Sequence, residues 1–179
     1  EGKIKHVIDS TGWITLDSHL HSTKSVDANA ALEQRVLGAI GEGLDILLST
    51  DHDIVIDYAP TAARLGVTDQ IKTETGIEIS PMYGHMNAFP MPTEGESYWH
   101  VPWFEYAEDH SYKRMIDPHE ITALARKKGA QVVQVNHPRL PQNIGYFNIV
   151  NFDPKSGRLP NVSFDTIEVY NGYELSHRE

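Results

Sequence analysis

Cysteine is absent from this sequence of 179 residues. Its absence excludes disulfide bonds, thiolate zinc sites and a cysteine nucleophile. It does not fix the compartment, because cytosolic and exported proteins can both lack cysteine. The sequence also has no apolar run that approaches the ~20 residues of a membrane-spanning helix. We therefore expect a soluble protein without a membrane span.

Positive charge is scarce. Lysine and arginine total 15 against 25 aspartates and glutamates, which gives a formal net charge of -10. Nucleic-acid binding needs a basic face, so this balance argues against a nucleic-acid partner and leaves a small-molecule substrate. The apolar share of 40% and the three tryptophans favour a globular fold. The length suits one domain, and we expect residues 1–179 to form it.

Short apolar runs alternate with segments of helical spacing. Helices are predicted at 30–40, 58–65 and 118–128, the last with Asp117 as its cap and Gly129 at its end. Strands are predicted at 13–17, 44–49, 71–79, 85–89, 131–135 and 164–169. This alternation favours an α/β fold with a largely parallel sheet, open or closed into a barrel. The connection 91–117 is too long for an ordinary loop. It is either a surface flap that packs its own aromatic side chains or a lid over substrate, and His100 within it is a candidate substrate-binding residue.

Histidine is the residue in excess, with ten copies. His19 and His21 follow the first predicted strand, two apart, so both imidazoles can point to one face. Four further ligand-type residues flank later strands: His52, Glu78, His85 and His137. Each alone is typical of an ordinary solvated or packed side chain. Because the carboxyl ends of parallel strands share one crevice, together they predict a metal site. Imidazole and carboxylate suit Zn, Mn, Fe or Ni better than Ca or Mg.

The motifs around these residues resemble, in their order, those of the polymerase-and-histidinol-phosphatase (PHP) superfamily. The resemblance spans residues 13–171 and rests on DSHLHS at 17–22, SVD at 25–27, STDH at 49–52, GIE at 76–78, GH at 84–85 and NHPR at 136–139. Within the superfamily, GHMNAFP at 84–90 and FDTIEVYNG at 164–172 are most similar to the carbaryl-hydrolase-related (CehA/McbA-like) branch.

This resemblance implies a distorted (β/α)7 barrel that holds two or three divalent ions of Zn, Mn or Fe. His19 and His21 would bind the first ion, Glu78 would bridge it to a second, and His85 and His137 would complete the second site. Asp27 and His52 would bind the third, although helix capping explains Asp27 equally well.

Two further residues are candidates for supporting roles. Asp51 is expected to orient a ligand histidine from behind rather than to bind metal itself. Arg139 is a candidate clamp for an oxyanion or a phosphate, with a surface ion pair as the alternative.

The sequence departs from the superfamily at its end. The family closes its site with an Asp-x-His pair after a last strand, and no such pair follows His137. The strand prediction is likewise one short of seven. We therefore expect a barrel without its last strand, with three explanations open. The chain is a fragment, the closing segment belongs to another chain, or the fold is altered.

The resemblance implies a metal-dependent hydrolase in which a hydroxide shared by two ions attacks the substrate. The superfamily as a whole implies phosphoester hydrolysis, whereas the branch favours carbamate, ester or amide bonds. A non-catalytic metal-binding accessory domain is a third reading, supported by the missing Asp-x-His pair.

Overall fold

The computed structural model describes residues 9–81, 84–93, 97–99, 104–140, 144–149 and 163–171. Its helices are α1 (Leu32–Glu42), α2 (Ala59–Leu65), α3 (Pro118–Lys128) and the single turn α4 (Tyr146–Ile149). Among the described residues, no helix is both long and apolar enough to span a membrane.

Local capping sets the ends of the long helices. The side chain of Asp117 accepts a hydrogen bond from the His119 backbone N–H at 2.8 Å, and α3 starts there as predicted. α1 starts later than predicted because the Gln34 side chain accepts from the backbone N–H of Ala31, which fixes the first turn. It continues to Gly43, whose φ of 78° suits the left-handed residue that ends a helix.

Two sheets carry most of the strands. The first is parallel, in the order β1-β2-β4, and consists of β1 (Leu16–Asp17), β2 (Ile46–Leu48) and β4 (Lys72–Glu74). The second has the order β11-β10-β6-β5 and consists of β5 (Ile77–Ile79), β6 (Met86–Phe89), β10 (Val132–Val135) and β11 (Thr166–Ile167). Two antiparallel pairs join β3 (Ile54–Val55) to β7 (Ser97–Tyr98) and β8 (Phe104–Tyr106) to β9 (Tyr112–Met115).

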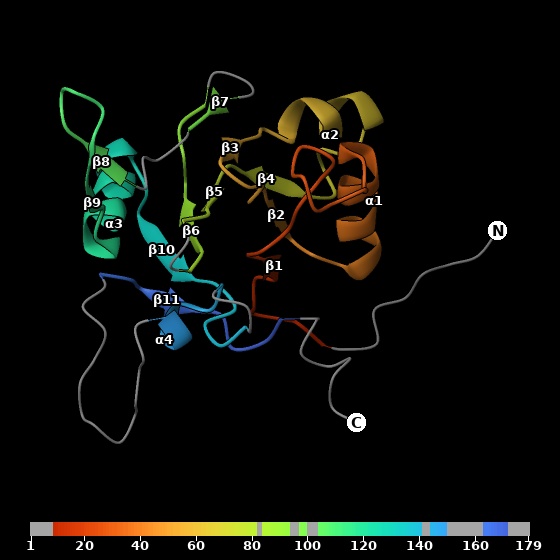
Figure 1. The fold of residues 1–179 in the computed structure, drawn as a ribbon. Coiled ribbons are helices and arrows are strands. Elements are labelled where there is room, and N and C mark those ends of the chain that lie inside the picture. The colour runs from red at the N-terminus through yellow and green to blue at the C-terminus, as the bar shows by residue number, and fades with distance from the viewer. Residues whose placement is uncertain are drawn as a thin grey trace.

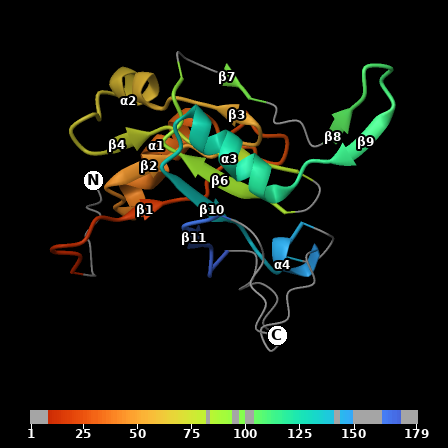
Figure 2. The same ribbon diagram turned by 90° about the vertical axis from the view of Figure 1, so that its left-hand side faces the viewer.

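Helices cover the two sheets separately. In Figure 1, α1 and α2 lie beside β1, β2 and β4, while α3 lies at the opposite end with β8 and β9. Figure 2 shows α3 across β6 and β10, with the β8–β9 hairpin extending away from the body. Each group has its own apolar cluster. One includes Val36, Leu47 and Tyr58, and the other includes Ile77, Val133 and Ile121.

The predicted fold, a distorted (β/α)7 barrel without its last strand, is wrong. Among the described residues the strands form several small sheets, and no ladder closes them into a barrel. The predicted strand 71–79 is one cause, because it bends and divides into β4 and β5. At the bend, a Cβ on Gly76 would lie 2.7 Å from the backbone oxygen of Ser49. The first half of this segment therefore pairs with β2 and the second half with β6.

The prediction of a largely parallel sheet is also only partly right, because β6 runs antiparallel to both β5 and β10. Its first residue, Met86, is paired with Ile79 and Val135, the last residues of its neighbours. The amino end of β6 therefore lies at the same edge as the carboxyl ends of β5 and β10. This reversal places His85 at that edge even though it precedes its strand.

Candidate metal centre

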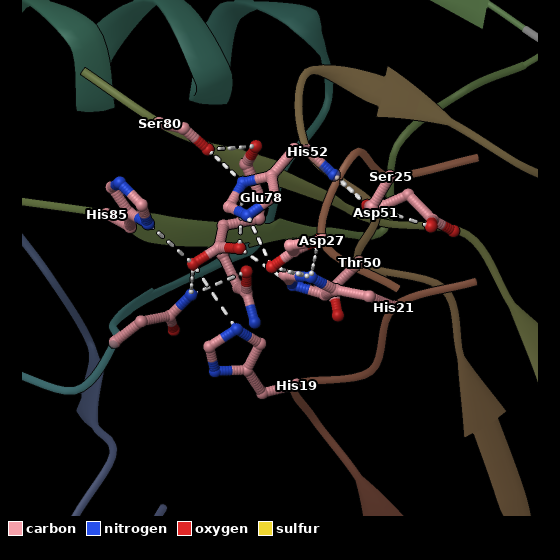
Figure 3. Close-up of polar contacts among 12 residues, drawn as sticks. His19, His21, Ser25, Asp27, Thr50, Asp51, His52, Glu78, Ser80 and His85 are labelled. Atoms are coloured by element: carbon pink, nitrogen blue, oxygen red, sulfur yellow. Dashed lines mark hydrogen bonds and ion pairs between the residues drawn. The ribbon is translucent and has the colours of Figure 1, made fainter. Parts of the chain in front are cut away.

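One buried carboxylate, that of Glu78 on β5, is the centre of the site. Its side chain has no exposed surface. Its Oε1 lies 3.2 to 3.3 Å from one nitrogen of each of three imidazoles, those of His19, His85 and His137. Its Oε2 lies 2.8 Å from His21 Nε2 and 3.1 Å from His52 Nδ1. Figure 3 shows side chains from separate elements converging on this carboxylate.

The five imidazoles form a closed ring around Glu78. Neighbouring ring centroids are 4.4 to 5.5 Å apart in the order His19, His21, His52, His85, His137 and back to His19. The five histidines come from segments that follow β1, β2 and β10 or that precede β6. An isolated parallel bridge between His52 and Glu78 ties the two sheets together at this point. The structure thus brings together every histidine that the sequence suggested as a ligand.

Asp27 extends the cluster toward solvent. Its carboxylate lies 3.0 Å from His21 Nδ1 and 3.2 Å from His52 Nε2, and its side chain is 51% exposed. It does not cap α1, because the N-cap of that helix is Ala31. Asp27 therefore belongs with the imidazoles and not with the helix start.

Several buried atoms of the site have no hydrogen-bond partner: His21 Nε2, Glu78 Oε2, His85 Nδ1 and His137 Nδ1. His21 Nε2 and Glu78 Oε2 approach each other without hydrogen-bond geometry. Orphaned buried polar atoms are rare unless a ligand satisfies them. Three groupings have ligand atoms within 4.8 Å of one another: His19–His21–Glu78, His52–Glu78–His85 and His21–Asp27–His52. Nitrogen and carboxylate donors in such groups can hold a metal ion.

A buried amide network holds Glu78 from behind. Asn136 Nδ2 donates to Glu78 Oε1 and to Asn87 Oδ1, both at 2.8 Å. Asn87 Nδ2 donates to the Ser18 backbone oxygen, and Gln134 Nε2 donates to Asn136 Oδ1. The Ser18 hydroxyl donates to Gln134 Oε1 and closes the loop. Residues on and beside β6 and β10 thus fix the Glu78 carboxylate through neutral donors, which add no charge beside it.

Sequence reasoning missed Glu168, which directly follows β11. Its carboxylate lies 3.1 Å from His19 Nδ1 and accepts a 2.6 Å hydrogen bond from the His137 backbone N–H. With Nδ1 facing Glu168, His19 presents Nε2 to Glu78, an arrangement typical of metal-binding histidines. The signal was present in the sequence, because Glu168 stands near the carboxyl end of the predicted strand 164–169, as several of the candidate ligands do on their strands.

Asp51 supports the loops that carry ligands and contacts no imidazole among the described residues. It is fully buried and accepts hydrogen bonds from the Ser22 backbone N–H at 2.7 Å and from both the Ser22 and Ser25 hydroxyls. Ser25 Oγ in turn accepts from the His52 backbone N–H at 2.9 Å. Asp51 is therefore linked to His52 through Ser25.

Burial and neighbouring charges shift the pKa values of the carboxylates and histidines of the site. Burial raises the pKa of Glu78, but the close imidazoles of His137, His19, His21 and His85 hold it well below its ordinary value. Burial lowers the pKa of His19, but its bonds to Glu168 and Glu78 raise it to about 10. Burial lowers the pKa of His52. Without metal, His19 is therefore protonated at neutral pH, and a cation bound at its Nε2 must displace that proton.

The cluster opens into a cavity of about 560 Å³. Arg139, the sequence candidate for an anion clamp, is not among its lining residues, and its guanidinium lies 5.8 Å from the centre of the Phe147 ring. Arg35 on α1 does line the cavity. The other sequence candidate for substrate contact, His100, lies outside the described residues.

No protein-family model and no curated protein matches the chain. The chemistry of this protein is therefore inferred from the site itself.

Proposed function

We propose that this protein is a metal-dependent hydrolase that cleaves phosphoesters, with a ligand set similar to that of the PHP superfamily. The observation that carries the proposal is the ring of five imidazoles around the buried carboxylate of Glu78. A carboxylate with nitrogen donors on both of its oxygens is suited to bridging two cations.

Glu78 would bridge two ions, the first held with His19 and His21 and the second with His85 and His137. His19, His85 and His137 face Oε1, whereas His21 and His52 face Oε2. Asp27 would hold a third, more exposed ion together with the outward nitrogen of His52. Zn, Mn and Fe are the divalent metals that this set of nitrogen and carboxylate ligands favours.

Ions in these positions would supply a nucleophile from water at neutral pH and polarise the phosphoryl oxygen of the substrate. The chain's own residues prepare the site for that reaction. Asn136 fixes the bridging carboxylate, Glu168 fixes the tautomer of His19, and Asp51 fixes the loops of His21 and His52. Such preorganisation of charged groups is the main source of catalysis in hydrolytic sites.

The cavity favours an enzyme over a metal-binding domain without turnover. A structural metal site is closed around its ion, whereas a catalytic one keeps a position open. Here the imidazoles form the wall of a space of about 560 Å³, which is within the range of small-molecule sites.

The test is to load the full chain with Zn, Mn or Fe and to measure metal content and hydrolysis together. Substrates would be p-nitrophenyl phosphate, bis(p-nitrophenyl) phosphate and 1-naphthyl N-methylcarbamate. We expect about two or more ions per chain and metal-dependent release of nitrophenol. Failure to bind metal contradicts the proposal as a whole. Bound metal without turnover supports the accessory-domain reading, and turnover of the carbamate alone supports the carbamate and ester reading.

A further inference from the structure

Arg35 is fixed in the wall of the metal cavity by the packing of α1. The helix buries Val36 and Ala39 in the apolar cluster beneath it, and this sets its rotation. Arg35, one position before Val36, is half-buried and lines the same cavity as the imidazoles. A rigid helix therefore presents a cation to the space in front of Glu78.

The contacts of Arg35 leave most of its donors available. Its Nε donates to the backbone oxygen of His21 at 2.5 Å, which holds the guanidinium against the ligand loop. Its two Nη atoms make no hydrogen bond or ion pair with any residue that the structure describes. The guanidiniums of Arg64, Arg114 and Arg126 do pair with carboxylates. A half-buried guanidinium without such a partner beside a cavity is suited to an anionic ligand.

The planar guanidinium matches the geometry of a phosphoryl group, which offers two oxygens to two parallel N–H donors. We propose that Arg35 is an oxyanion-binding residue whose Nη atoms hold the non-reacting phosphoryl oxygens of the substrate. This inference rests on the proposed function. It favours an anionic phosphoester over a neutral carbamate as the substrate.

Phosphate binding by the metal-loaded full chain tests this role. Inorganic phosphate would be titrated into the unsubstituted protein and into the variants Arg35→Gln, Arg35→Lys and Arg64→Gln. Arg64→Gln is the control, because Arg64 pairs with Glu33 on the exposed face. We expect Arg35→Gln to weaken phosphate binding by roughly 10- to 100-fold, the range of a charge-assisted hydrogen bond. Arg35→Lys should be intermediate, and Arg64→Gln should stay within about 2-fold, as for an exposed pair.

A second probe separates oxyanion binding from support of the His21 loop. Acetohydroxamate binds metal as a monoanion and has no phosphoryl oxygens, so Arg35→Gln should weaken its binding much less than that of phosphate. Metal content, measured by elemental analysis, should be equal in the unsubstituted protein and in Arg35→Gln. Equal loss of phosphate and acetohydroxamate binding, or loss of metal in both Arg35 variants, would make Arg35 a positioning residue and overturn the inference. Unchanged phosphate binding would overturn it as well. An unsubstituted protein that binds no metal would instead contradict the proposed function.

Discussion

Glu78, His85 and His137 lie on or beside strands of the four-stranded sheet, whereas His21, Asp27 and His52 lie on loops that follow β1 and β2. The sheet half is held by amides that are themselves buried, Asn136 and Asn87. The loop half is held by Asp51 through serine hydroxyls, and its outermost ligand, Asp27, is 51% exposed. The comparison teaches that the sheet half is tied to strand pairing and buried amides, whereas the loop half is tied to serine hydroxyls and ends at a half-exposed carboxylate. We expect the sheet half to bind metal more tightly.

The largest effect should come from the residue that both halves share. Glu78→Gln removes the charge that two ions would share, whereas loss of one imidazole removes one neutral donor. We expect metal affinity to fall by more than roughly 100-fold, beyond the usual effect of residues behind the ligands. His137→Gln is the comparison variant and should spare the His21–Asp27–His52 group. Full metal occupancy in Glu78→Gln, measured by elemental analysis, would show that Glu78 is not a bridge.

A smaller effect, confined to the sheet half, should follow from Asn136→Ala. It removes the buried amide that donates to both Glu78 Oε1 and Asn87 Oδ1, and such a loss destabilises a protein by about 1–3 kcal/mol. We expect the affinity of the tightest ion to fall by roughly 10- to 100-fold. Asp51→Asn should instead weaken the more weakly bound ion. Calorimetric titration of metal into both variants measures the two affinities. If Asn136→Ala and Asp51→Asn lowered the affinity of the same ion equally, the comparison would be contradicted.

The link between the halves through Glu168 should appear in the dependence of stability on pH. The pKa of His19 in the folded, metal-free protein is about 10, above its ordinary 6.5. Its ion pairs therefore stabilise the fold fully below pH 6.5, and this contribution is lost as the pH rises through 10. In Glu168→Gln, the loss between pH 7 and 10 should be smaller. Urea unfolding of both proteins without metal measures it, and identical curves would show that Glu168 does not control His19.

The smallest effect should come from Asp27→Asn at the exposed end of the loop half. An exposed carboxylate interacts through water, so its contribution is modest. We expect the tightest ion to be unaffected and the weakest to bind several-fold less well, about the scale of 1 kcal/mol. Competition with a chelator measures the affinity of the tightest ion. A large fall in that affinity would place Asp27 among the ligands of this ion and show that the loop half, and not the sheet half, binds metal more tightly.

Local features of the fold were predictable where a few neighbouring residues decide them. The cap at Asp117 and the stop at Gly129 gave the bounds of α3. The barrel prediction failed, because closure of a barrel depends on pairing between distant segments. Neither the reversal of β6 nor the bend at Gly76 has a signal in apolar periodicity. The β8–β9 hairpin was missed because Tyr112–Met115 is exposed throughout and has no buried face to produce alternation.

The candidate site likewise has a part that the sequence predicts and a part that it does not. Imidazoles and a carboxylate at strand ends are visible in the sequence, and the structure brings them to one edge of the sheets. Asn87, Asn136 and Gln134 were missed, because an asparagine becomes a support for Glu78 only when strand register brings them together. Arg139 was chosen because it is next to His137 in sequence, and Arg35 was not considered. The rotation of α1, set by its buried face, brings Arg35 to the cavity.

The central claim is that Glu78 is shared by two metal ions within the histidine ring. Anomalous scattering from crystals grown with zinc or manganese tests this claim most directly. We expect two strong peaks, one beside each oxygen of Glu78, with bonds of about 2.0–2.2 Å to imidazole nitrogen or carboxylate oxygen for a zinc-like ion. A single peak that contacts one oxygen of Glu78, or peaks away from the ring, would contradict it.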